Sequence, residues 1–411
     1  MSSTSGRSLM LIDGNSLTYR AFHALPPDLA TASGQVTNAV FGFTSMLIYT
    51  VREHRPDGIA VAFDLPEPTF RHKQLDSYKA NRDKAPDVLR EQMGLVRQVL
   101  DVLHVPILEL PGFEADDIIA TLATRAAAAK DEVLIVTGDR DSFQLVSDPY
   151  IKVVYNKRGV SDYALYDEAG IEERTGVKPS SYVQYAALRG DNSDNLPGVP
   201  GVGEKTAAKL INKYGDIDGI YANVAEQTPK LRQNLEENED QARLNTIIMD
   251  LVRDAPVEAE IDSFFEREAP EIGPLKELFD FLEFRTLYER LDGVFLGDTG
   301  GDEPSATEGA AIDPVMASGT PSELLSNHDG PLAVAVGRDG EGPSAPVSGV
   351  AFVVDEEGSK VGWLPAADLA DLETIAGEGI WTHDGKPLIR ALLAANVAVP
   401  RLSLDTALAA Y

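Results

Sequence analysis

Three carboxylates stand within four residues at Glu114-Ala115-Asp116-Asp117, where a helical pattern begins. Glu114 and Asp117 are three positions apart and share one face of that helix, with Asp116 beside them. A single acid in the first turn would be explained by its favourable interaction with the helix dipole. Three like charges so close raise one another's pKa unless a cation compensates them. This stretch therefore predicts one part of a metal site.

Four more acids follow apolar runs that have the length of buried strands. Asp13 ends the first run, Asp64 ends the second, and Asp139 and Asp141 follow the third. One aspartate after a strand is more often a turn or cap residue, but three strands that end alike favour a shared site.

Helical patterns alternate with these runs, which is typical of an α/β domain with a mainly parallel sheet. We expect strands at 8–13, 58–64, 105–110 and 132–138 and helices at 15–23, 37–54, 87–104 and 114–130. Sites in such sheets lie at the carboxyl ends of the strands, so the acids should meet there.

Asp191 and Asp194 form one more acidic pair at a spacing of three, after a helix expected at 179–189. The predicted metal ligands are Asp13, Asp64, Glu114, Asp116, Asp117, Asp139, Asp141, Asp191 and Asp194. An all-oxygen set suits Mg²⁺ or Mn²⁺, and so many acids suggest two or more ions. Two ions about 3.5–4 Å apart are the usual arrangement for phosphodiester hydrolysis.

A phosphate substrate also needs fixed positive charge. The window 70–84, which follows the second strand, is the most basic part of this half of the chain. Tyr78 is placed to stack on a base, and Lys79 and Arg82 to contact the scissile phosphate. The alternative is a solvated surface segment with a buried tyrosine, and the window alone does not decide between them.

A glycine-rich turn, PGVPGVGEKTAAK, opens a helix that carries Lys205 and Lys209. Glycines let the backbone approach a ligand closely, and free N–H groups at a helix start bind phosphate without reading sequence. The turn therefore predicts a contact with a nucleic-acid backbone.

Composition limits the remaining classes of function. The 411 residues carry a net charge of −30 and contain no cysteine, which excludes disulfides, zinc–thiolate sites and cysteine nucleophiles. No run approaches the about 18 apolar residues of a membrane span, and we expect a cytoplasmic setting. The strong negative charge alone argues against nucleic acid, but local patches decide the partner.

Together these stretches resemble the 5′-nuclease domain of bacterial DNA polymerase I, the flap-endonuclease and 5′→3′ exonuclease family. The resemblance covers about residues 8–291 and rests on LIDGNSLTYRAFHALP, FDLPEPTFRHKQLDSYKANR, GFEADDIIATL, TGDRDSFQLV and LRGDNSDNLPGVPGVGEKTAAKLI. It implies a PIN-like core at 1–175 with a helical arch over the site. It also implies a helix–three-turn–helix DNA clamp at 176–296.

The resemblance also assigns roles to single residues. The family's metal acids fall on the nine positions named above, and the implied catalytic residues are Lys79, Arg82, Asp13, Asp116 and Asp139. The implied DNA contacts are Arg20, Arg71, Tyr78, Lys79, Arg82, Gly198, Val199, Gly201, Val202, Gly203, Lys205, Thr206 and Lys209. The turn 198–203 is similar to one that holds a monovalent cation, commonly K⁺.

The implied partners are DNA with 5′ flaps, nicks or RNA-primed 5′ ends, in DNA repair and primer removal. The resemblance further implies a monomer, near the nucleoid, with a covalently joined polymerase domain that this sequence lacks. Cleavage should leave a 5′-phosphate and a 3′-hydroxyl.

After an expected flexible linker at 297–330, residues 331–411 resemble the start of a 3′→5′ exonuclease domain of the RNase H-like α/β class. Val336 and Arg338 stand where the acids of its first strand belong, and Pro387 stands near the next expected Asp. We therefore expect a degenerate domain without proofreading, which mismatch excision dependent on this region would contradict.

Two other readings of the chain are a non-catalytic module that binds DNA junctions and a PIN-type ribonuclease. Retention of all nine acids with Lys79 and Arg82 favours a nuclease over a decayed module. The basic window and the glycine-rich turn argue against a minimal ribonuclease, which needs neither.

Overall fold

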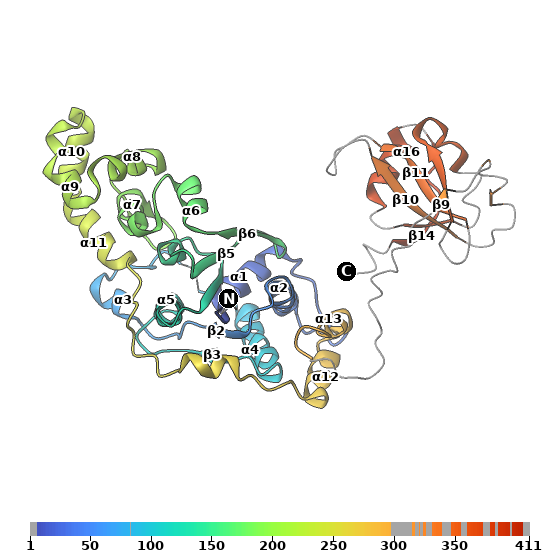
Figure 1. Cartoon of the computed structure of the whole chain (residues 1–411), viewed down its shortest axis with the longest axis horizontal. Coiled ribbons are helices and arrows are strands. Elements are labelled where there is room, and N and C mark those ends of the chain that lie inside the picture. The colour runs from blue at the N-terminus through green and yellow to red at the C-terminus, as the bar shows by residue number, and fades with distance from the viewer. Residues whose placement is uncertain are drawn as a thin grey trace, which may run out of the picture. The chain divides into compact units, whose positions relative to one another are not determined.

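The computed structural model describes residues 6–82 and 84–296, and then 315–316, 320, 324–325, 331–338, 347–354, 360–372, 379–382, 385–394 and 397–405. The chain divides into two compact units, Met1–Thr299 and Gly300–Tyr411, which are treated separately (Figure 1). Most of the linker expected at 297–330 lies outside the described residues. The expected boundary between 175 and 176 falls inside the first unit and stays a prediction.

The first unit is built on a six-stranded sheet in the order β3-β2-β1-β4-β5-β6. Its strands are β1 (Ser8–Asp13), β2 (Gly58–Ala62), β3 (Ile107–Leu108), β4 (Glu132–Thr137), β5 (Ile151–Arg158) and β6 (Asp162–Tyr166). Every neighbouring pair is parallel except β5 with β6. The predicted mainly parallel α/β fold is therefore confirmed.

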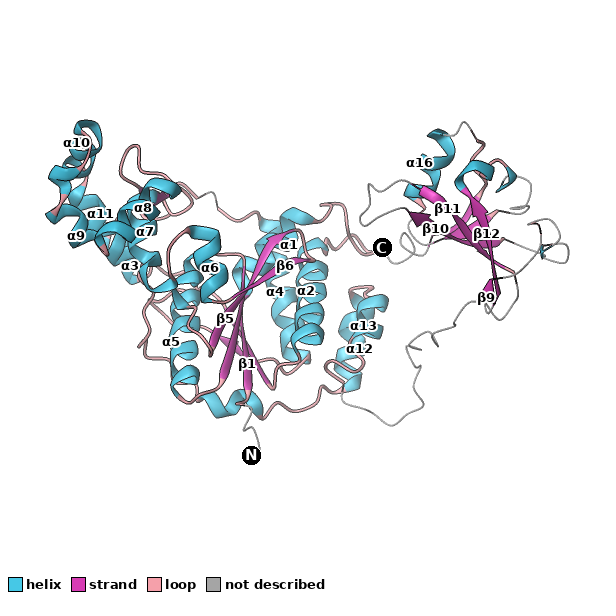
Figure 2. Ribbon diagram, turned by 45° about the horizontal axis from the view of Figure 1, so that its top comes forward, coloured by secondary structure: helices cyan, strands magenta, loops and turns pink. Residues whose placement is uncertain are grey.

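Helices cover both faces of this sheet, as Figure 2 shows. Helix α5 (Ala115–Ala128) packs on one face, and α1 (Gly14–Ala24), α2 (Asn38–His54) and α4 (Asp87–Val102) pack on the other. In β1, Leu9 and Leu11 join the core beneath α5, while Met10 and Ile12 join the opposite core. Because both faces are buried, the strand reads as an unbroken apolar run.

The strand order reverses at β1, whose two neighbours are β2 and β4. In open sheets of this kind the chain departs to opposite sides at such a point, which leaves a crevice beyond the carboxyl ends of the strands. Asp13 is the last residue of β1, and Asp139 lies two residues after β4. The topology alone therefore brings these two acids to the crevice.

A mainly helical region follows β6. Its helices are α6 (Glu168–Thr175), α7 (Tyr182–Arg189), α8 (Glu204–Tyr214), α9 (Ile217–Ala222), α10 (Pro229–Glu237) and α11 (Glu239–Met249), followed by α12 (Ile272–Phe281) and α13 (Arg285–Arg290). The basic window contributes a short helix, α3 (Phe70–Gln74). The helix expected at 179–189 begins with one 3₁₀ turn at Pro179–Ser181 before α7.

The glycine-rich turn connects a short hairpin to α8. The hairpin consists of β7 (Gly190–Asp191) and β8 (Leu196–Pro197). A Cβ on Gly198 would lie 2.1 Å from the carbonyl oxygen of Arg189, so no other residue fits there. Val199 and Val202 are buried under the turn, and the side-chain amide of Asn234 donates to the Pro200 carbonyl at 2.6 Å. The turn is thus held from below, with its backbone outermost.

The second unit carries a sheet in the order β14-β13-β10-β11-β12-β9. Its elements are β9 (Val315–Met316), β10 (Leu332–Arg338), β11 (Val347–Val353), β12 (Lys360–Pro365), β13 (Ile380–Thr382), α16 (Lys386–Ala394) and β14 (Leu402–Asp405). Strands β10, β11 and β12 are antiparallel to their neighbours in this group, β13 runs parallel beside β10, and β14 runs parallel beside β13. The expected RNase H-like class of this unit stays a prediction. Val336 pairs with Val350 in the middle of β10, and the loss of proofreading chemistry stays a prediction.

Among the residues that the structure describes, no helix combines the length and the apolar character needed to cross a bilayer.

Candidate active site

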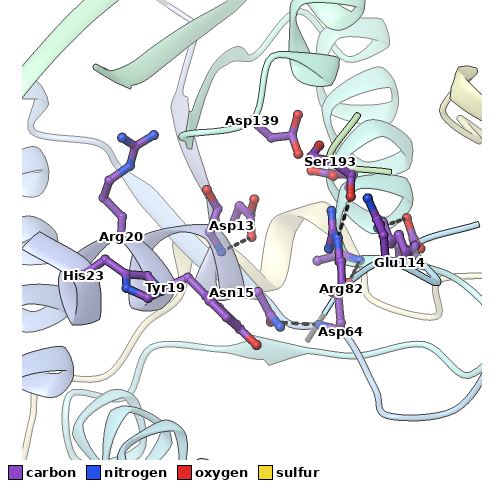
Figure 3. Close-up of a pocket in the computed structure, with 15 residues that line it drawn as sticks. Asp13, Asn15, Tyr19, Arg20, His23, Asp64, Arg82, Glu114, Asp139 and Ser193 are labelled. Carbon is purple, nitrogen blue, oxygen red and sulfur yellow. Dashed lines mark hydrogen bonds and ion pairs between the residues drawn. The ribbon is translucent and has the colours of Figure 1, made fainter. Parts of the chain in front are cut away.

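A cavity of about 790 Å³ opens beyond the carboxyl ends of β1, β2 and β4 (Figure 3). Five of the predicted metal acids line it, namely Asp13, Asp64, Glu114, Asp116 and Asp139. Residues of the basic window, Lys79 and Arg82, line the same cavity. The structure therefore brings together all five predicted catalytic residues.

Backbone and side-chain donors orient each acid of the strand ends. Asp13 caps α1 by accepting from the Ser16 N–H at 2.9 Å, and it accepts from the Thr137 hydroxyl at 2.9 Å. Asp64 accepts from the Ala115 N–H at 2.8 Å, which ties the end of β2 to the start of α5. The expectation that a single acid after a strand acts as a cap residue is thus correct for Asp13. The hydrogen bonds of Asp13 and Asp64 orient their carboxylates towards the cavity.

Mutual repulsion and burial raise the pKa of these carboxyls. Withdrawal from solvent raises the pKa of Asp13 to about 7, and the charges of Asp64 and Asp139 add to the shift. Desolvation, followed by the charges of Asp13, Asp139 and Asp64, holds the pKa of Asp116 well above its usual range. The negative charge of the cavity carboxylates is therefore not balanced by the cations beside them.

Asp116 gives direct evidence for that imbalance. Its Oδ1 is buried and has no hydrogen-bond partner within the described part of the chain. Buried polar atoms are nearly always paired, so an orphaned carboxylate oxygen beside other carboxylates fits a hard divalent cation. In the described residues, no three acidic or histidine side chains already stand in the arrangement of an ion site. The fit thus rests on donor chemistry and burial.

A second acidic group adjoins the cavity and consists of Asp141, Asp191 and Asp194. Burial and the charges of Asp139, Asp194 and Asp191 raise the pKa of Asp141 well above its usual value. Asp139 feels the charges of Asp194 and Asp191 in turn, after its own desolvation. The nine predicted ligands thus fall into a cavity cluster of five, an adjoining cluster of three, and Asp117.

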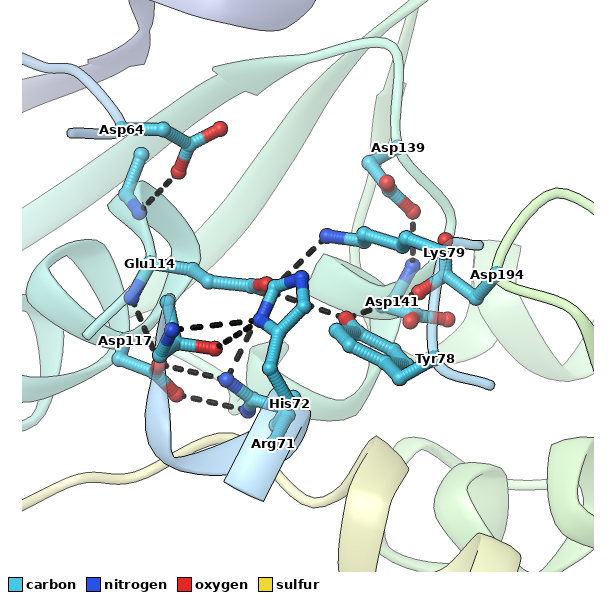
Figure 4. A network of polar contacts seen from close by, with 12 residues as sticks. Asp64, Arg71, His72, Tyr78, Lys79, Glu114, Asp117, Asp139, Asp141 and Asp194 are labelled. Carbon is cyan, nitrogen blue, oxygen red and sulfur yellow. Dashed lines mark hydrogen bonds and ion pairs between the residues drawn. The ribbon is translucent and has the colours of Figure 1, made fainter. Parts of the chain in front are cut away.

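The structure corrects the roles predicted for two residues, Asp117 and Arg71. Arg71 is 1% exposed and forms a two-pronged ion pair with Asp117, at 2.6 and 2.8 Å (Figure 4). Asp117 also accepts from the backbone N–H groups of Glu114 and Val252, so both of its oxygens are fully used. The geometry therefore supports neither Asp117 as a metal ligand nor Arg71 as a DNA contact. The pair joins α3 to α5 and, through hydrogen bonds with the backbone of residues 248–252, to the end of α11 and the segment after it.

Tyr78 also differs from its expected role in base stacking. It is 3% exposed, and its hydroxyl lies 3.0 Å from Glu114 Oε2 and 3.1 Å from Asp194 Oδ2. The tyrosine therefore bridges the two acidic clusters, which is the buried-tyrosine alternative for this window.

Lys79 and Arg82 pair with the same two acids that Tyr78 bridges. The Lys79 ammonium lies 3.0 Å from Glu114 Oε2, and Arg82 lies 2.6 Å from Asp194 Oδ1. Lys79 has a positive φ of 54° and donates its N–H to the Asp194 carbonyl at 2.9 Å. The basic window thus supplies internal cations to both clusters.

Several cavity residues were not singled out from the sequence. These are Asn15, Ser16, Tyr19, His23, Asn81 and Ser193. Asn15 lies in the first turn of α1, two residues after Asp13, and it accepts from the Asp64 N–H at 3.0 Å. Tyr19 is 39% exposed on the cavity wall, where His23 is exposed as well. The predicted contact Arg20 lines the same wall.

The predicted contacts of the glycine-rich turn lie outside this cavity. Lys205 and Lys209 are exposed on α8, and Thr206 is half-buried between them. Gly201 has a positive φ of 80° and is exposed, as is Gly203 at the cap of α8. These residues form a separate surface whose exposed cations all lie on one helix.

Comparison with known proteins is consistent with this geometry. Residues 8–176 match the model of the 5′–3′ exonuclease N-terminal resolvase-like domain, and residues 177–271 match the 5′–3′ exonuclease C-terminal SAM fold. The chain is 39% identical over 429 residues to DNA polymerase I of Mycobacterium tuberculosis and 36% identical over 415 residues to that of Bacillus caldotenax. Each alignment covers 98% of this chain and 45% of the relative. The chain thus spans about half the length of these relatives.

The fold is also similar to a solved structure of T5 5′-exonuclease with bound zinc. The TM-score is 0.50 at 23% identity, over 63% of this chain and 97% of that one.

The chain thus falls in the class of doubly wound α/β proteins that carry clustered carboxylates and cations at the switch point of the sheet. Within that class, this chain belongs to the 5′–3′ exonuclease family, which the two matched models cover from residue 8 to residue 271. The predicted family, fold class and enzyme class are confirmed at this level.

The Arg71–Asp117 pair leads to a prediction about stability. Replacing Arg71 by Ala leaves Asp117 buried without its cation, and we expect a loss of about 3 kcal/mol or more in the free energy of unfolding. The double variant Arg71→Ala/Asp117→Ala should lose less than the sum of the single variants. Urea unfolding of all four proteins measures this coupling, and additive losses would show that the pair is not energetically linked.

The raised pKa values predict how stability depends on pH. A carboxyl whose pKa is higher in the folded state stabilises the fold at low pH, and this contribution is lost as pH rises towards about 7. In EDTA, the melting temperature should therefore fall between about pH 4 and about pH 7, and Mg²⁺ should restore it.

Asp116→Asn is the control for that experiment, because it removes one charge from the cluster. In EDTA at about pH 8 it should raise the melting temperature by about 2–4 °C, which corresponds to about 1 kcal/mol in a domain of this size. It should also reduce the stabilisation by Mg²⁺. A variant that melts below the wild type would mean that the cluster is not under repulsion.

Proposed function

We propose that the chain is a metal-dependent, structure-specific 5′ nuclease that hydrolyses phosphodiester bonds at 5′ flaps, nicks and RNA-primed 5′ ends. The observation that carries the proposal is the meeting of five carboxylates with Lys79 and Arg82 around one cavity. Family membership supports the direction of attack, from the 5′ end. The biological setting that fits is DNA repair and primer removal.

The cofactors we propose are two or more Mg²⁺ or Mn²⁺ ions. Asp13, Asp64, Glu114, Asp116 and Asp139 would hold ions in the cavity, and Asp141, Asp191 and Asp194 would hold ions in the adjoining cluster. Bound there, divalent ions would supply the charge that activates water and stabilises the leaving 3′ oxygen. The metal-bound T5 5′-exonuclease has the same fold, which supports a divalent ion in this place.

The residues of the chain position the substrate around those ions. Lys79 and Arg82 would turn from Glu114 and Asp194 to the scissile phosphate, where fixed positive charge favours the developing negative charge. Arg20 lies on the opposite part of the wall and would hold a neighbouring phosphate (Figure 3). Tyr19, which is exposed at the cavity, would stack on the terminal base in place of the buried Tyr78.

We propose that the turn 198–203 and α8 hold the duplex through its backbone. The exposed backbone of the turn would bind a monovalent cation such as K⁺ between protein and phosphate, with Lys205, Thr206 and Lys209 beside it. Exchange of K⁺ for tetramethylammonium at equal ionic strength should then weaken duplex binding. Unchanged binding would remove the cation from the proposal.

The wider setting is proposed from the relatives. Since the relatives are DNA polymerases I and the chain spans about half of their length, we propose a covalently joined polymerase region. We further propose a cytoplasmic, nucleoid-associated protein that acts as a monomer, which light scattering coupled to gel filtration would test.

Cleavage of a 5′-labelled double-flap DNA tests the nuclease directly. The wild type should release the flap near the junction in Mg²⁺ or Mn²⁺ and not in EDTA. Asp116→Asn and Asp139→Asn should each lower the cleavage rate by about 10³-fold or more while leaving DNA binding within about threefold. Tight binding without cleavage in any metal would instead identify a junction-binding module.

A second measurement locates the duplex on α8. Lys205→Ala should weaken binding and lower the slope of log K against log salt by about one, because one phosphate contact is lost. Lys276→Ala is the matched control, since Lys276 is an exposed lysine on α12 that pairs with Asp280. If both variants keep the wild-type slope, the duplex does not lie on α8.

A further inference from the structure

A second, smaller cavity of about 200 Å³ lies between the acid clusters and the glycine-rich turn. Separate elements contribute its polar walls: Arg140 after β4, Arg174 at the end of α6, Tyr182 and Arg189 on α7, and Glu204 at the start of α8. None of these residues was assigned a role above.

The charge of this cavity is opposite to that of the chain. The guanidinium groups of Arg140, Arg174 and Arg189 and the single carboxylate of Glu204 line it, in a protein whose net charge is −30. An Arg189 nitrogen also lies 3.9 Å from Asp191 Oδ2, outside the cavity lining. Glu204 Oε1 lies 3.2 Å from an Arg140 nitrogen and 3.8 Å from an Arg189 nitrogen. The Glu204 side chain is 62% exposed and the Arg189 side chain only 16%. The exposed Glu204 carboxylate thus lies beside the more buried Arg189 guanidinium, in the place that a bound anion would take.

The third arginine is held in place by aromatic rings. The Arg174 guanidinium lies 5.4 Å from the Tyr155 ring centroid and 5.5 Å from that of Tyr166, and it donates to the Tyr166 hydroxyl at 3.1 Å. No ion pair to Arg174 is found among the described residues. Stacking fixes the guanidinium without neutralising its charge, which keeps it available to an anion.

Tyr182 is an independent sign of a ligand. Its side chain is 1% exposed, and its hydroxyl has no hydrogen-bond partner in the described part of the chain. The ring is fixed between Phe143 and Tyr185, at centroid distances of 5.6 and 5.7 Å. A buried hydroxyl without a partner is costly, and this one lines the arginine cavity, where it has a donor to offer.

The place of the cavity indicates which anion it meets. Arg140 follows Asp139, which lines the catalytic cavity, and Glu204 is the first residue after the glycine-rich turn. A duplex held on the turn, with one strand entering the catalytic cavity, must carry its backbone past this point.

We propose that this cavity binds a backbone phosphodiester of the DNA duplex, with Arg140, Arg174, Arg189 and the Tyr182 hydroxyl as donors. Glu204 occupies the cavity entrance in the free protein and yields to the phosphate, so that it weakens DNA binding. This inference deepens the proposed function and rests on it.

Two variants give opposite and diagnostic changes in binding. We compare them in the Asp116→Asn background, by titrating a double-flap DNA at several salt concentrations. Tyr182→Phe should weaken binding about threefold to tenfold, while its melting temperature stays unchanged or rises because an unpaired hydroxyl is removed. Glu204→Gln should tighten binding about threefold, because the competing carboxylate is gone.

Arg174→Ala provides the electrostatic measurement. It should weaken binding and lower the salt slope by about one. Arg90→Ala is the matched control, since Arg90 is an exposed arginine whose ion pair is to Asp87 on the same helix, and it should change neither quantity.

Unchanged binding by Tyr182→Phe together with no gain from Glu204→Gln would overturn the proposal. So would a Tyr182→Phe protein that melts lower, because its hydroxyl would then be satisfied within the fold. If inorganic phosphate raises the melting temperature through Tyr182 but DNA binding is unaffected, the cavity takes free phosphate and the assignment to DNA fails.

Cleavage by the wild type on the same DNA separates this inference from the nuclease. Normal cleavage without the changes in binding keeps the nuclease and removes the phosphate cavity. If the binding changes appear as expected but the wild type does not cleave, the phosphate cavity is kept and the nuclease proposal is removed.

Discussion

Repulsion among carboxylates at the end of a parallel sheet is the constraint on which the rest of this molecule depends. The strand order brings Asp13 and Asp139 to one crevice, and the capped ends of β2 and α5 add Asp64 and Asp116. Such a cluster persists only if the surrounding fold is strong enough to hold it and cations are near. The two apolar cores on either face of the sheet supply that strength, and the basic window supplies Lys79 and Arg82.

Much of this arrangement could be predicted from the sequence because it follows from local patterns. Strands buried on both faces read as unbroken apolar runs, and β1, β2 and β4 end within two residues of their expected positions. Acids that follow such strands meet by topology, so three of the five cavity acids, Asp13, Asp64 and Asp139, could be grouped without knowing any tertiary contact. The antiparallel pair β5 and β6 was not predicted, since its polar residues at 156–158 interrupt the apolar pattern.

The sequence could not separate residues that share a stretch but differ in partner. Asp117 stands next to Asp116, yet Asp117 is paired with Arg71 whereas Asp116 lines the cavity. That difference depends on helix rotation and on the segment at 248–252, which is far along the chain. Tyr78 illustrates the same point, because its burial depends on Glu114 and Asp194, two acids contributed by distant parts of the chain.

The two ends of the basic window, residues 70–84, are held by different kinds of ion pair. Arg71, near its start, is locked to Asp117 inside the protein, whereas Lys79 is tied to Glu114 on the cavity side (Figure 4). Arg82, further along, is tied to Asp194. A cation that binds the Glu114 or Asp194 oxygen now paired with one of these side chains would weaken that ion pair. Linkage makes the relation reciprocal, so a phosphate that draws Lys79 or Arg82 away also raises the affinity of the vacated acids for a cation. In the proposed nuclease, binding of the ion and binding of the substrate would therefore be coupled through the same ion pairs.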